Sequence, residues 1–262
     1  MAFEEQLASA KFAARSAAQV IMDIYNSNSA EVTIKDDDSP VTQADIAADR
    51  LIQNILRQNY PNYGFLTEES SDDKSRLCND FVWVVDPIDG TKDFINRTGE
   101  FTINIALIYK HRPVVGVIAI PAKNEMYFAS EGNGAFYQYN DHIEKIHVSD
   151  KENNLVAFRS RFHYGGIEKE YYEAHNDVIS EVVIVGSSIK ACHIAHGLAH
   201  VYAKLSNGTK EWDVAPSDII VKEAGGIFLK PDGSIMTYNR DDVYNREGFI
   251  IMNKLHKNLL VK

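Results

Sequence analysis

Residues 81–85 read F-V-W-V-V, and the string D-P-I-D-G-T follows directly over residues 86–91. The apolar run predicts a buried strand, and the proline and glycine after it predict a tight turn that leads into a helix. Two carboxylates three residues apart, with the Ile88 carbonyl between them, would then offer oxygen ligands to a divalent cation. Backbone N–H groups of Gly90 and Thr91 at the helix start are placed to bind an anion. The string therefore indicates a site for a metal ion and a phosphate.

An ordinary strand-to-helix turn with solvated carboxylates is the other interpretation of this string. Three further acidic residues favour the metal site. Glu68 follows a short apolar stretch, Asp213 opens a helix-like segment after Trp212, and Asp45 enters another helix beside Thr42. If the chain brings them to the same place, it can hold a cation through several carboxylates.

The charge of the chain points to the same chemistry. Its 37 Asp and Glu residues outnumber its 27 Lys and Arg residues, for a net charge of −10. Long nucleic acids need a basic face that releases counterions, so we expect no nucleic-acid polymer as a partner. A small polyanion can still bind an acidic protein when divalent cations stand between the carboxylates and the phosphate, and this favours Mg²⁺ as the cofactor.

The distribution of apolar residues predicts a protein of the cytoplasm. No apolar run approaches the roughly 18 residues that a membrane helix needs, so we expect no membrane partner. Acidic residues Glu4 and Glu5 at the start of the chain do not fit a secretory signal. Cys78 and Cys192 lack metal-type spacing and are expected to be buried free thiols. The oligomeric state stays open, because no coiled-coil heptads are visible.

Hydrophobic periodicity predicts alternating helices and strands. The region between residues 101 and 139 alternates with period two and predicts an antiparallel meander, and residues 36–38 are expected to form a solvated charged loop. Helices are expected at residues 3–25, 43–58, 187–197 and 212–224, and further strands at 156–158 and 182–185. The pattern predicts an α+β layered sandwich, a single domain over residues 1–262 whose two lobes, approximately 1–150 and 151–262, meet near residue 150.

Several motifs together resemble the inositol monophosphatase superfamily of Mg²⁺-dependent, lithium-sensitive phosphatases. They are V-T-x-A-D at 41–45, E-E-S at 68–70, D-P-I-D-G-T at 86–91, and W-D followed by A-G-G within 212–226. The resemblance spans nearly the whole chain. It implies a layered α/β/α/β/α sandwich of the inositol monophosphatase and fructose-1,6-bisphosphatase type, with metal ions at the junction of the lobes.

Within this superfamily, the chain resembles the 3′(2′),5′-bisphosphate nucleotidase branch. The resemblance rests on the run at 89–108, on G-S-S-I-K at 186–190 and on E-W-D at 211–213. Lys92-Asp93 stands where inositol monophosphatases usually carry Thr-Asn or similar residues. The implied reaction is hydrolysis of the 3′-phosphate of adenosine 3′,5′-bisphosphate to AMP and phosphate by a metal-activated water.

The resemblance also implies the metal ligands. Glu68, Asp86 and the Ile88 carbonyl are expected to hold a first Mg²⁺ ion. Asp86, Asp89 and Asp213 are expected to hold a second, with Asp86 bridging, and a third, weaker ion would contact Glu68 through waters. A few carboxylates suffice because Mg²⁺ keeps several waters among its ligands.

The family's threonine–aspartate pair implies a catalytic role for Thr91 and Asp45. Asp45 would orient the Thr91 hydroxyl, which would position and help to deprotonate the attacking water. The second metal would stabilise the departing ribose oxygen, as in two-metal phosphoryl transfer. Glu68 would take part in catalysis as a ligand of the first metal.

The resemblance places a further group of residues at the substrate. Lys190, at the start of a helix, is expected to bind the phosphate that is not cleaved, whereas Lys204 stands where the branch commonly has arginine. The stretch around His163 resembles a Ser-Arg-Ser-His sequence of the branch, with Phe162 as a departure. The expected substrate contacts are Gly90, Thr91, His163, Ser187, Ser188, Lys190, Lys204 and Asp213.

Two other functions stay open on the sequence. One is a sugar phosphatase of the same fold, either an inositol monophosphatase or a fructose-1,6-bisphosphatase. The other is a catalytically silent binding protein, which would be marked by a missing carboxylate in the acidic set. All five members are present: Asp45, Glu68, Asp86, Asp89 and Asp213.

Overall fold

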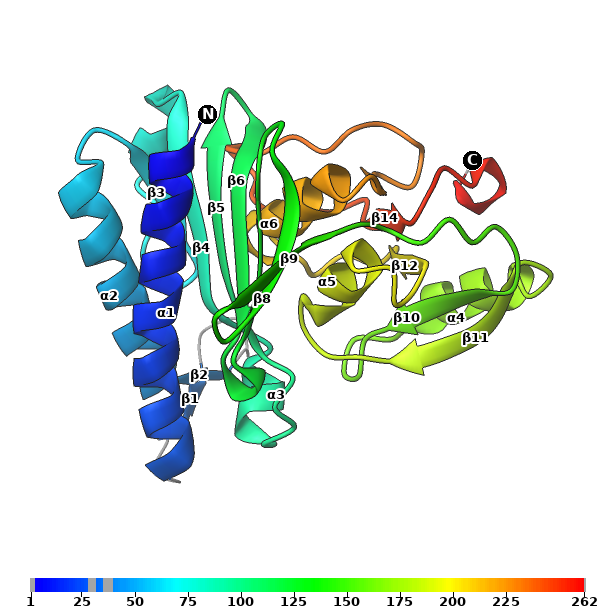
Figure 1. The fold of residues 1–262 in the computed structure, drawn as a ribbon, viewed down its shortest axis with the longest axis horizontal. Coiled ribbons are helices and arrows are strands. Elements are labelled where there is room, and N and C mark those ends of the chain that lie inside the picture. The colour runs from blue at the N-terminus through cyan, green and yellow to red at the C-terminus, as the bar shows by residue number, and fades with distance from the viewer. Residues whose placement is uncertain (1–2, 28–31, 35–39, 262) are drawn as a thin grey trace.

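The computed structural model describes residues 3–27, 32–34 and 40–261. Helices and sheets are stacked in the order α/β/α/β/α, which confirms the predicted layered α+β sandwich (Figure 1). Hydrophobic clusters fill the spaces between these layers. The charged loop predicted at residues 36–38 lies outside the described residues.

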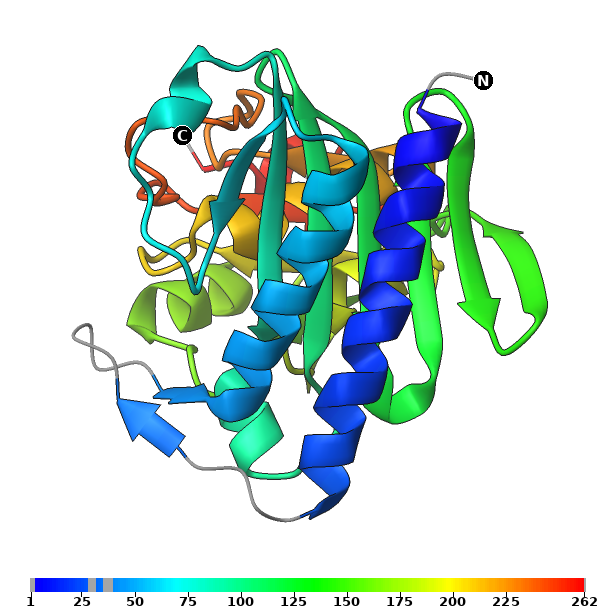
Figure 2. The same ribbon diagram turned by 90° about the vertical axis from the view of Figure 1, so that its left-hand side faces the viewer.

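The first outer layer is a pair of long helices, α1 (Glu4–Ser27) and α2 (Gln43–Asn59). Both lie across one face of the larger sheet (Figure 2). Small buried residues such as Ala10 and Ala14 recur at helical spacing on α1 and let the two helices pack closely. The helices predicted at 3–25 and 43–58 are confirmed to within two residues at each end.

A seven-stranded sheet forms the second layer, with the strands in the order β3-β4-β5-β6-β7-β8-β9. Strands β3 and β4 are parallel and the remaining neighbours are antiparallel, which confirms the predicted meander. The sequence analysis did not predict β3 or β9. The strands are β3 (Gly64–Thr67), β4 (Phe81–Asp89), β5 (Thr102–Tyr109), β6 (Arg112–Ile120), β7 (Glu125–Ser130), β8 (Gly134–Tyr139) and β9 (His142–Ile146).

The central layer consists of α5 (Ile189–Ala195) and α6 (Glu211–Glu223), which are sandwiched between the two sheets. Helix α6 approaches β6 closely at Gly116, where an added Cβ would lie 2.6 Å from Ile219 Cγ2 and 2.8 Å from the Pro216 carbonyl oxygen. Glycine is therefore required at this contact. The helix continues past Pro216, although proline cannot donate a backbone hydrogen bond there.

A five-stranded sheet with the order β11-β10-β12-β14-β13 forms the fourth layer. Its far face is covered by α4 (Gly166–Ala174) and by the short 3₁₀ helix η3 (Lys257–Leu259). The strands predicted at 156–158 and 182–185 are present, and the other three were not predicted. The strands are β10 (Leu155–Arg159), β11 (Ile179–Ile184), β12 (Val201–Lys204), β13 (Ile227–Leu229) and β14 (Phe249–Met252).

The remaining elements are short. They are β1 (Val32–Ile34), β2 (Pro40–Thr42), η1 (Ser75–Cys78), α3 (Thr91–Ile95) and η2 (Pro121–Lys123). Both cysteines are free thiols, as predicted, but only Cys192 is buried. The prediction of a buried Cys78 was wrong, because η1 places it at the surface. In the part of the chain that is described, no helix is both long and apolar enough to cross a membrane. The boundary between lobes near residue 150 stays a prediction.

The contact at Gly116 predicts a stability effect. Gly116→Ala would push α6 away from β6 and lower the free energy of unfolding by about 1 to 3 kcal/mol, the usual cost of overpacking. Urea unfolding followed by circular dichroism would measure it. Gly166→Ala is the control, since an added Cβ there meets no atom within 4 Å. Equal stability of the two variants would contradict a tight contact between α6 and β6.

Candidate metal and phosphate site

The site begins where β4 leaves the larger sheet. Asp86 is buried near the end of this strand, and the Ile88 N–H donates a hydrogen bond to its Oδ1 at 3.0 Å. The register between β4 and β5 shifts between Asp86 and Asp89, so the strand is irregular at the predicted turn. Glu68 follows the neighbouring strand β3, and its N–H donates to the Val85 carbonyl at 3.1 Å. The parallel pairing of β3 and β4 therefore brings Glu68 beside Asp86.

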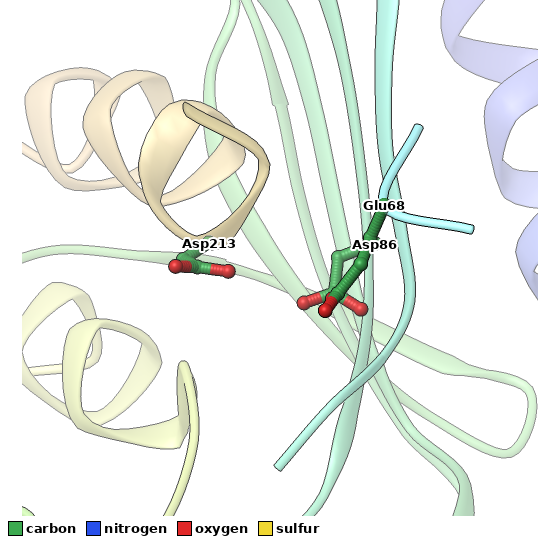
Figure 3. Close-up of side chains that lie close together, drawn as sticks. All are labelled: Glu68, Asp86 and Asp213. Carbon is green, nitrogen blue, oxygen red and sulfur yellow. The ribbon is translucent and has the colours of Figure 1, made fainter. Parts of the chain in front are cut away.

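The third carboxylate comes from the central layer. Asp213 lies in the first turn of α6, where its Oδ2 accepts a hydrogen bond from the Lys210 N–H at 2.7 Å. Glu68, Asp86 and Asp213 offer oxygen atoms that all lie within 4.8 Å of one another. Asp213 faces the other two from the opposite side of the site (Figure 3). Three carboxylates so arranged can share a cation.

The electrostatics of the site favour a cation. Burial raises the pKa of Asp86 well above its usual value, and the nearby charges of Glu68 and Asp89 raise it further. The pKa of Asp213 is raised in the same way, first by burial and then by Asp89 and Glu68. A divalent cation would remove this penalty. An all-oxygen donor set of carboxylates suits Mg²⁺, so the residues present fit the predicted ion.

Asp89 is tied to the central layer. Its Oδ2 accepts hydrogen bonds from the hydroxyls of Ser187 and Ser188, both at 2.8 Å, and from that of Thr102 at 3.4 Å. Asp89 does not belong to the group of carboxylates that approach within 4.8 Å. The structure therefore brings both serines to the site, where they contact a predicted metal ligand.

The predicted pair of Thr91 and Asp45 is in contact. Gly90 adopts the left-handed conformation with φ of 93°, and α3 starts at the next residue. The Thr91 hydroxyl lies 3.4 Å from Asp45 Oδ1 and 3.3 Å from the Ile88 carbonyl oxygen. The Thr42 N–H donates to Asp45 Oδ2 at 2.9 Å, as part of the capping box of α2. Burial raises the pKa of Asp45 to about 6, although the hydrogen bonds from Thr42 oppose the rise.

The two predicted lysines reach the site but are held by protein groups. The Lys190 ammonium donates to the backbone carbonyls of Val185 and Ser187, at 3.2 and 2.5 Å. Burial lowers its pKa to about 8, against the opposing charge of Asp89. The Lys204 ammonium contacts Glu168 at 3.4 Å.

His163 approaches the same place from the segment after β10. Burial lowers the pKa of His163, and the positive charges of Lys92 and Lys204 lower it further. The neutral form of the imidazole is therefore favoured near these two lysines.

One cavity of about 600 Å³ contains nearly all of these groups. Asp45 is the exception among the predicted site residues: it does not line the cavity but contacts Thr91, which does. The other predicted residues that line the cavity are Glu68, Asp86, Ile88, Asp89, Gly90, Thr91, His163, Ser187, Ser188, Lys190, Lys204 and Asp213. Aromatic side chains, including Phe162 and Tyr244, line it as well.

The sequence analysis missed two polar residues that support the site. Thr102 and Asn104 lie two residues apart on β5, and Asn104 Nδ2 donates to the Ser188 hydroxyl at 2.9 Å. Polar residues with period two inside an apolar strand were the available signal.

Two residues of the nucleotidase-like motifs have structural contacts. Asp93 pairs with Arg161 at 3.3 Å. Glu211 is fully buried and accepts hydrogen bonds from the backbone of Asn239 and Arg240, outside the cavity. Glu211 thus holds the segment after β13 in place.

Comparison with known proteins agrees with the motifs. The model of the inositol monophosphatase family matches residues 4–262. The 3′(2′),5′-bisphosphate nucleotidase CysQ of Escherichia coli K12 is 37% identical over 238 residues, which cover 90% of this chain and 95% of that protein. The crystal structure of CysQ from Bacteroides thetaiotaomicron matches with a TM-score of 0.85 and 34% identity, over 96% of this chain and 98% of the other. The structure of a Thermotoga maritima IMPase matches with a TM-score of 0.83 and 26% identity, over 98% of this chain and 95% of the other.

Repulsion at the site predicts a stability change for Asp86→Asn. Because the pKa of Asp86 is raised on folding, its ionised form destabilises the metal-free protein, increasingly so as the pH rises above about 4. In EDTA at pH 8 the variant should therefore melt at a higher temperature than the original protein, with a smaller gain at pH 5. Differential scanning fluorimetry measures this.

Adding MgCl₂ should stabilise the original protein more than Asp86→Asn. The original protein should gain about 5 to 10 °C in Tm at roughly 100 times Kd, and Asp86→Asn should gain much less. Asp177→Asn, at an exposed position outside the cavity, is the control and should behave like the original protein. A Tm of Asp86→Asn below that of the original protein in EDTA would contradict the repulsion.

Proposed function

The chain belongs to the inositol monophosphatase family, and we propose that it is a Mg²⁺-dependent 3′(2′),5′-bisphosphate nucleotidase. The proposed reaction is hydrolysis of the 3′-phosphate of adenosine 3′,5′-bisphosphate to AMP and phosphate. The observation that carries the proposal is the 37% identity, over nine-tenths of the chain, to a nucleotidase of that name. The converging carboxylates in a cavity that lysines also line support it.

Five groups of the chain are proposed to hold two or three Mg²⁺ ions. They are the carboxylates of Glu68, Asp86, Asp89 and Asp213 and the carbonyl of Ile88. Bound Mg²⁺ supplies a water of lowered pKa and neutralises charge on the phosphoryl oxygens. The Asp89 carboxylate already accepts hydrogen bonds from the hydroxyls of Ser187 and Ser188, so it would bind a cation in addition to these two donors.

Thr91 and Asp45 are proposed to orient the attacking water. At neutral pH, Asp45 is mostly ionised, since its pKa is about 6. Its carboxylate can accept a hydrogen bond from the Thr91 hydroxyl. The lone pairs of Thr91 Oγ1 are then free to accept a hydrogen bond from the attacking water. The capping box between Thr42 and Asp45 fixes the Asp45 carboxylate and therefore the orientation of the Thr91 hydroxyl.

The cavity wall opposite β4 is proposed to bind the rest of the substrate. Lys190 and Lys204 bring positive charge for the phosphate that is not cleaved, and His163 is a neutral hydrogen-bonding group beside them. At neutral pH Lys190 is mostly protonated, because its pKa of about 8 lies above the ambient pH. The backbone of Gly90 and Thr91, with Ser187 and Ser188, is proposed to contact the cleaved phosphate.

The remaining expectations accompany this proposal. We propose that the chain acts as a single domain in the cytoplasm on a small phosphorylated nucleotide and binds no nucleic-acid polymer. Lithium inhibition, implied by the family resemblance, is proposed with it.

A substrate panel tests the proposed function. Phosphate release from adenosine 3′,5′-bisphosphate, inositol 1-phosphate and fructose 1,6-bisphosphate should be measured side by side, with MgCl₂ and with EDTA. We expect the highest kcat/KM for the nucleotide and loss of activity in EDTA. A nucleotide that is the poorest substrate of the three would overturn the proposal in favour of a sugar phosphatase. No Mg²⁺-dependent release from any of them would favour a silent binding protein.

Removing the water-orienting pair should lower kcat. Thr91→Ala and Asp45→Asn should each reduce kcat by about 10²-fold or more, the scale of losing a general base. Thr91→Ser keeps the hydroxyl and should retain most of the activity. Thr237→Ala, at an exposed position outside the cavity, is the matched control and should change nothing. An unchanged kcat in both Thr91→Ala and Asp45→Asn would rule out the proposed role.

A further inference from the structure

Asp49 is a buried carboxylate on α2 that the proposed reaction does not use. Asp49 is 3% exposed and lies one helical turn after Asp45. Asp49 Oδ2 accepts hydrogen bonds from the Ser70 hydroxyl at 3.0 Å and from Gln53 Nε2 at 2.7 Å. Gln53 Nε2 also donates to the Ser70 hydroxyl at 2.8 Å. Asp49, Gln53 and Ser70 thus form a closed set of hydrogen bonds.

This set of hydrogen bonds adjoins the predicted metal ligand Glu68. On its N-terminal side, Glu68 is fixed by β3, which is paired in register with β4 through Thr67 and Val85. Its own N–H continues this pairing by donating to the Val85 carbonyl. On the C-terminal side no strand continues, and the chain reaches Ser70 two residues later. The hydrogen bond from Ser70 to Asp49 fastens this side to α2.

The position of Asp49 on α2 links two parts of the site. Asp45 and Asp49 are four residues apart and therefore lie on the same face of the helix. Asp45 contacts Thr91, and Asp49 holds the segment that carries Glu68. One rigid helix thus sets the spacing between the water-orienting pair and a carboxylate of the metal site.

We propose that Asp49 is a positioning residue that, through Ser70, holds Glu68 where it can bind Mg²⁺, an inference that rests on the proposed function. Burying a carboxylate costs free energy unless hydrogen bonds compensate it. The two donors at Oδ2 offset part of this cost, and one of them belongs to the Glu68 segment, whereas Oδ1 accepts no hydrogen bond from the described residues. Partners of this kind behind metal ligands typically change metal affinity by 10- to 100-fold.

A purely structural role for Asp49 makes a different prediction. In that case its removal would lower Tm and leave Mg²⁺ affinity unchanged. The measurement that separates the two roles is therefore binding of Mg²⁺ itself. Isothermal titration of MgCl₂ into the metal-free protein, without substrate, reports it independently of activity.

Four variants define the experiment. Asp49→Ala removes the hydrogen bond from Ser70 to Asp49, and Ser70→Ala removes both this bond and the one that Ser70 receives from Gln53. Each should raise the Kd for Mg²⁺ by about 10-fold or more. Asp49→Asn keeps an acceptor oxygen and should stay within roughly 3-fold of the original protein. Ile52→Val, a buried change on the same helix, is the matched control, which should lower Tm without changing Kd.

Each result decides between the roles. An unchanged Kd in Asp49→Ala, or in Ser70→Ala should the former not fold, would overturn the positioning role. A Kd raised as much by Ile52→Val would also overturn it. If the original protein itself binds no Mg²⁺, the proposed function fails together with this inference, whereas normal binding by the original protein and by Asp49→Ala removes this inference alone.

Discussion

Repulsion between buried carboxylates is the constraint on which the site depends. Glu68, Asp86 and Asp213 would separate if their positions were set by flexible side chains alone. Each is instead fixed by a backbone hydrogen bond. The Asp86 carboxylate accepts one from the Ile88 N–H, and the Asp213 carboxylate accepts one from the N–H of Lys210 at the start of α6. The N–H of Glu68 donates to the neighbouring strand and so extends the pairing of β3 with β4. The secondary structure thus holds these charges together against their electrostatic repulsion, and a bound cation would remove the repulsion.

The layers around the site supply this rigidity. The seven-stranded sheet is covered on one face by α1 and α2 and on the other by α5 and α6, with a hydrophobic cluster on each side. The site lies at the point where β4 ends and α6 begins, so its geometry follows from how α6 packs on the sheet. The close approach at Gly116 sets that packing. The position of Asp213 therefore depends on a glycine far from it in sequence.

The sequence predicted the features that leave a local pattern. The long helices α1 and α2 and the meander have clear periodicity, and the apolar run before Asp86 identified β4. Strands such as β12 and β13 have only three or four residues and leave no period to recognise. Side-chain directions also escaped prediction: Glu211 turns to the backbone at residues 239–240, and Lys190 to carbonyls of its own turn. Such choices depend on which partner the tertiary fold brings near.

The order of strands in the smaller sheet bears on how the protein is synthesised. Strand β14, which follows β12 and β13 in sequence, lies between them and pairs with both. While a ribosome is still adding the residues that precede it, β12 and β13 have a gap between them, and Phe249 and Ile251 are absent from the core that α6 packs against. The site-bearing helix can thus settle only after β14 has been added to the chain. A growing chain would expose apolar surface until then, which makes chaperone contact most useful at this stage.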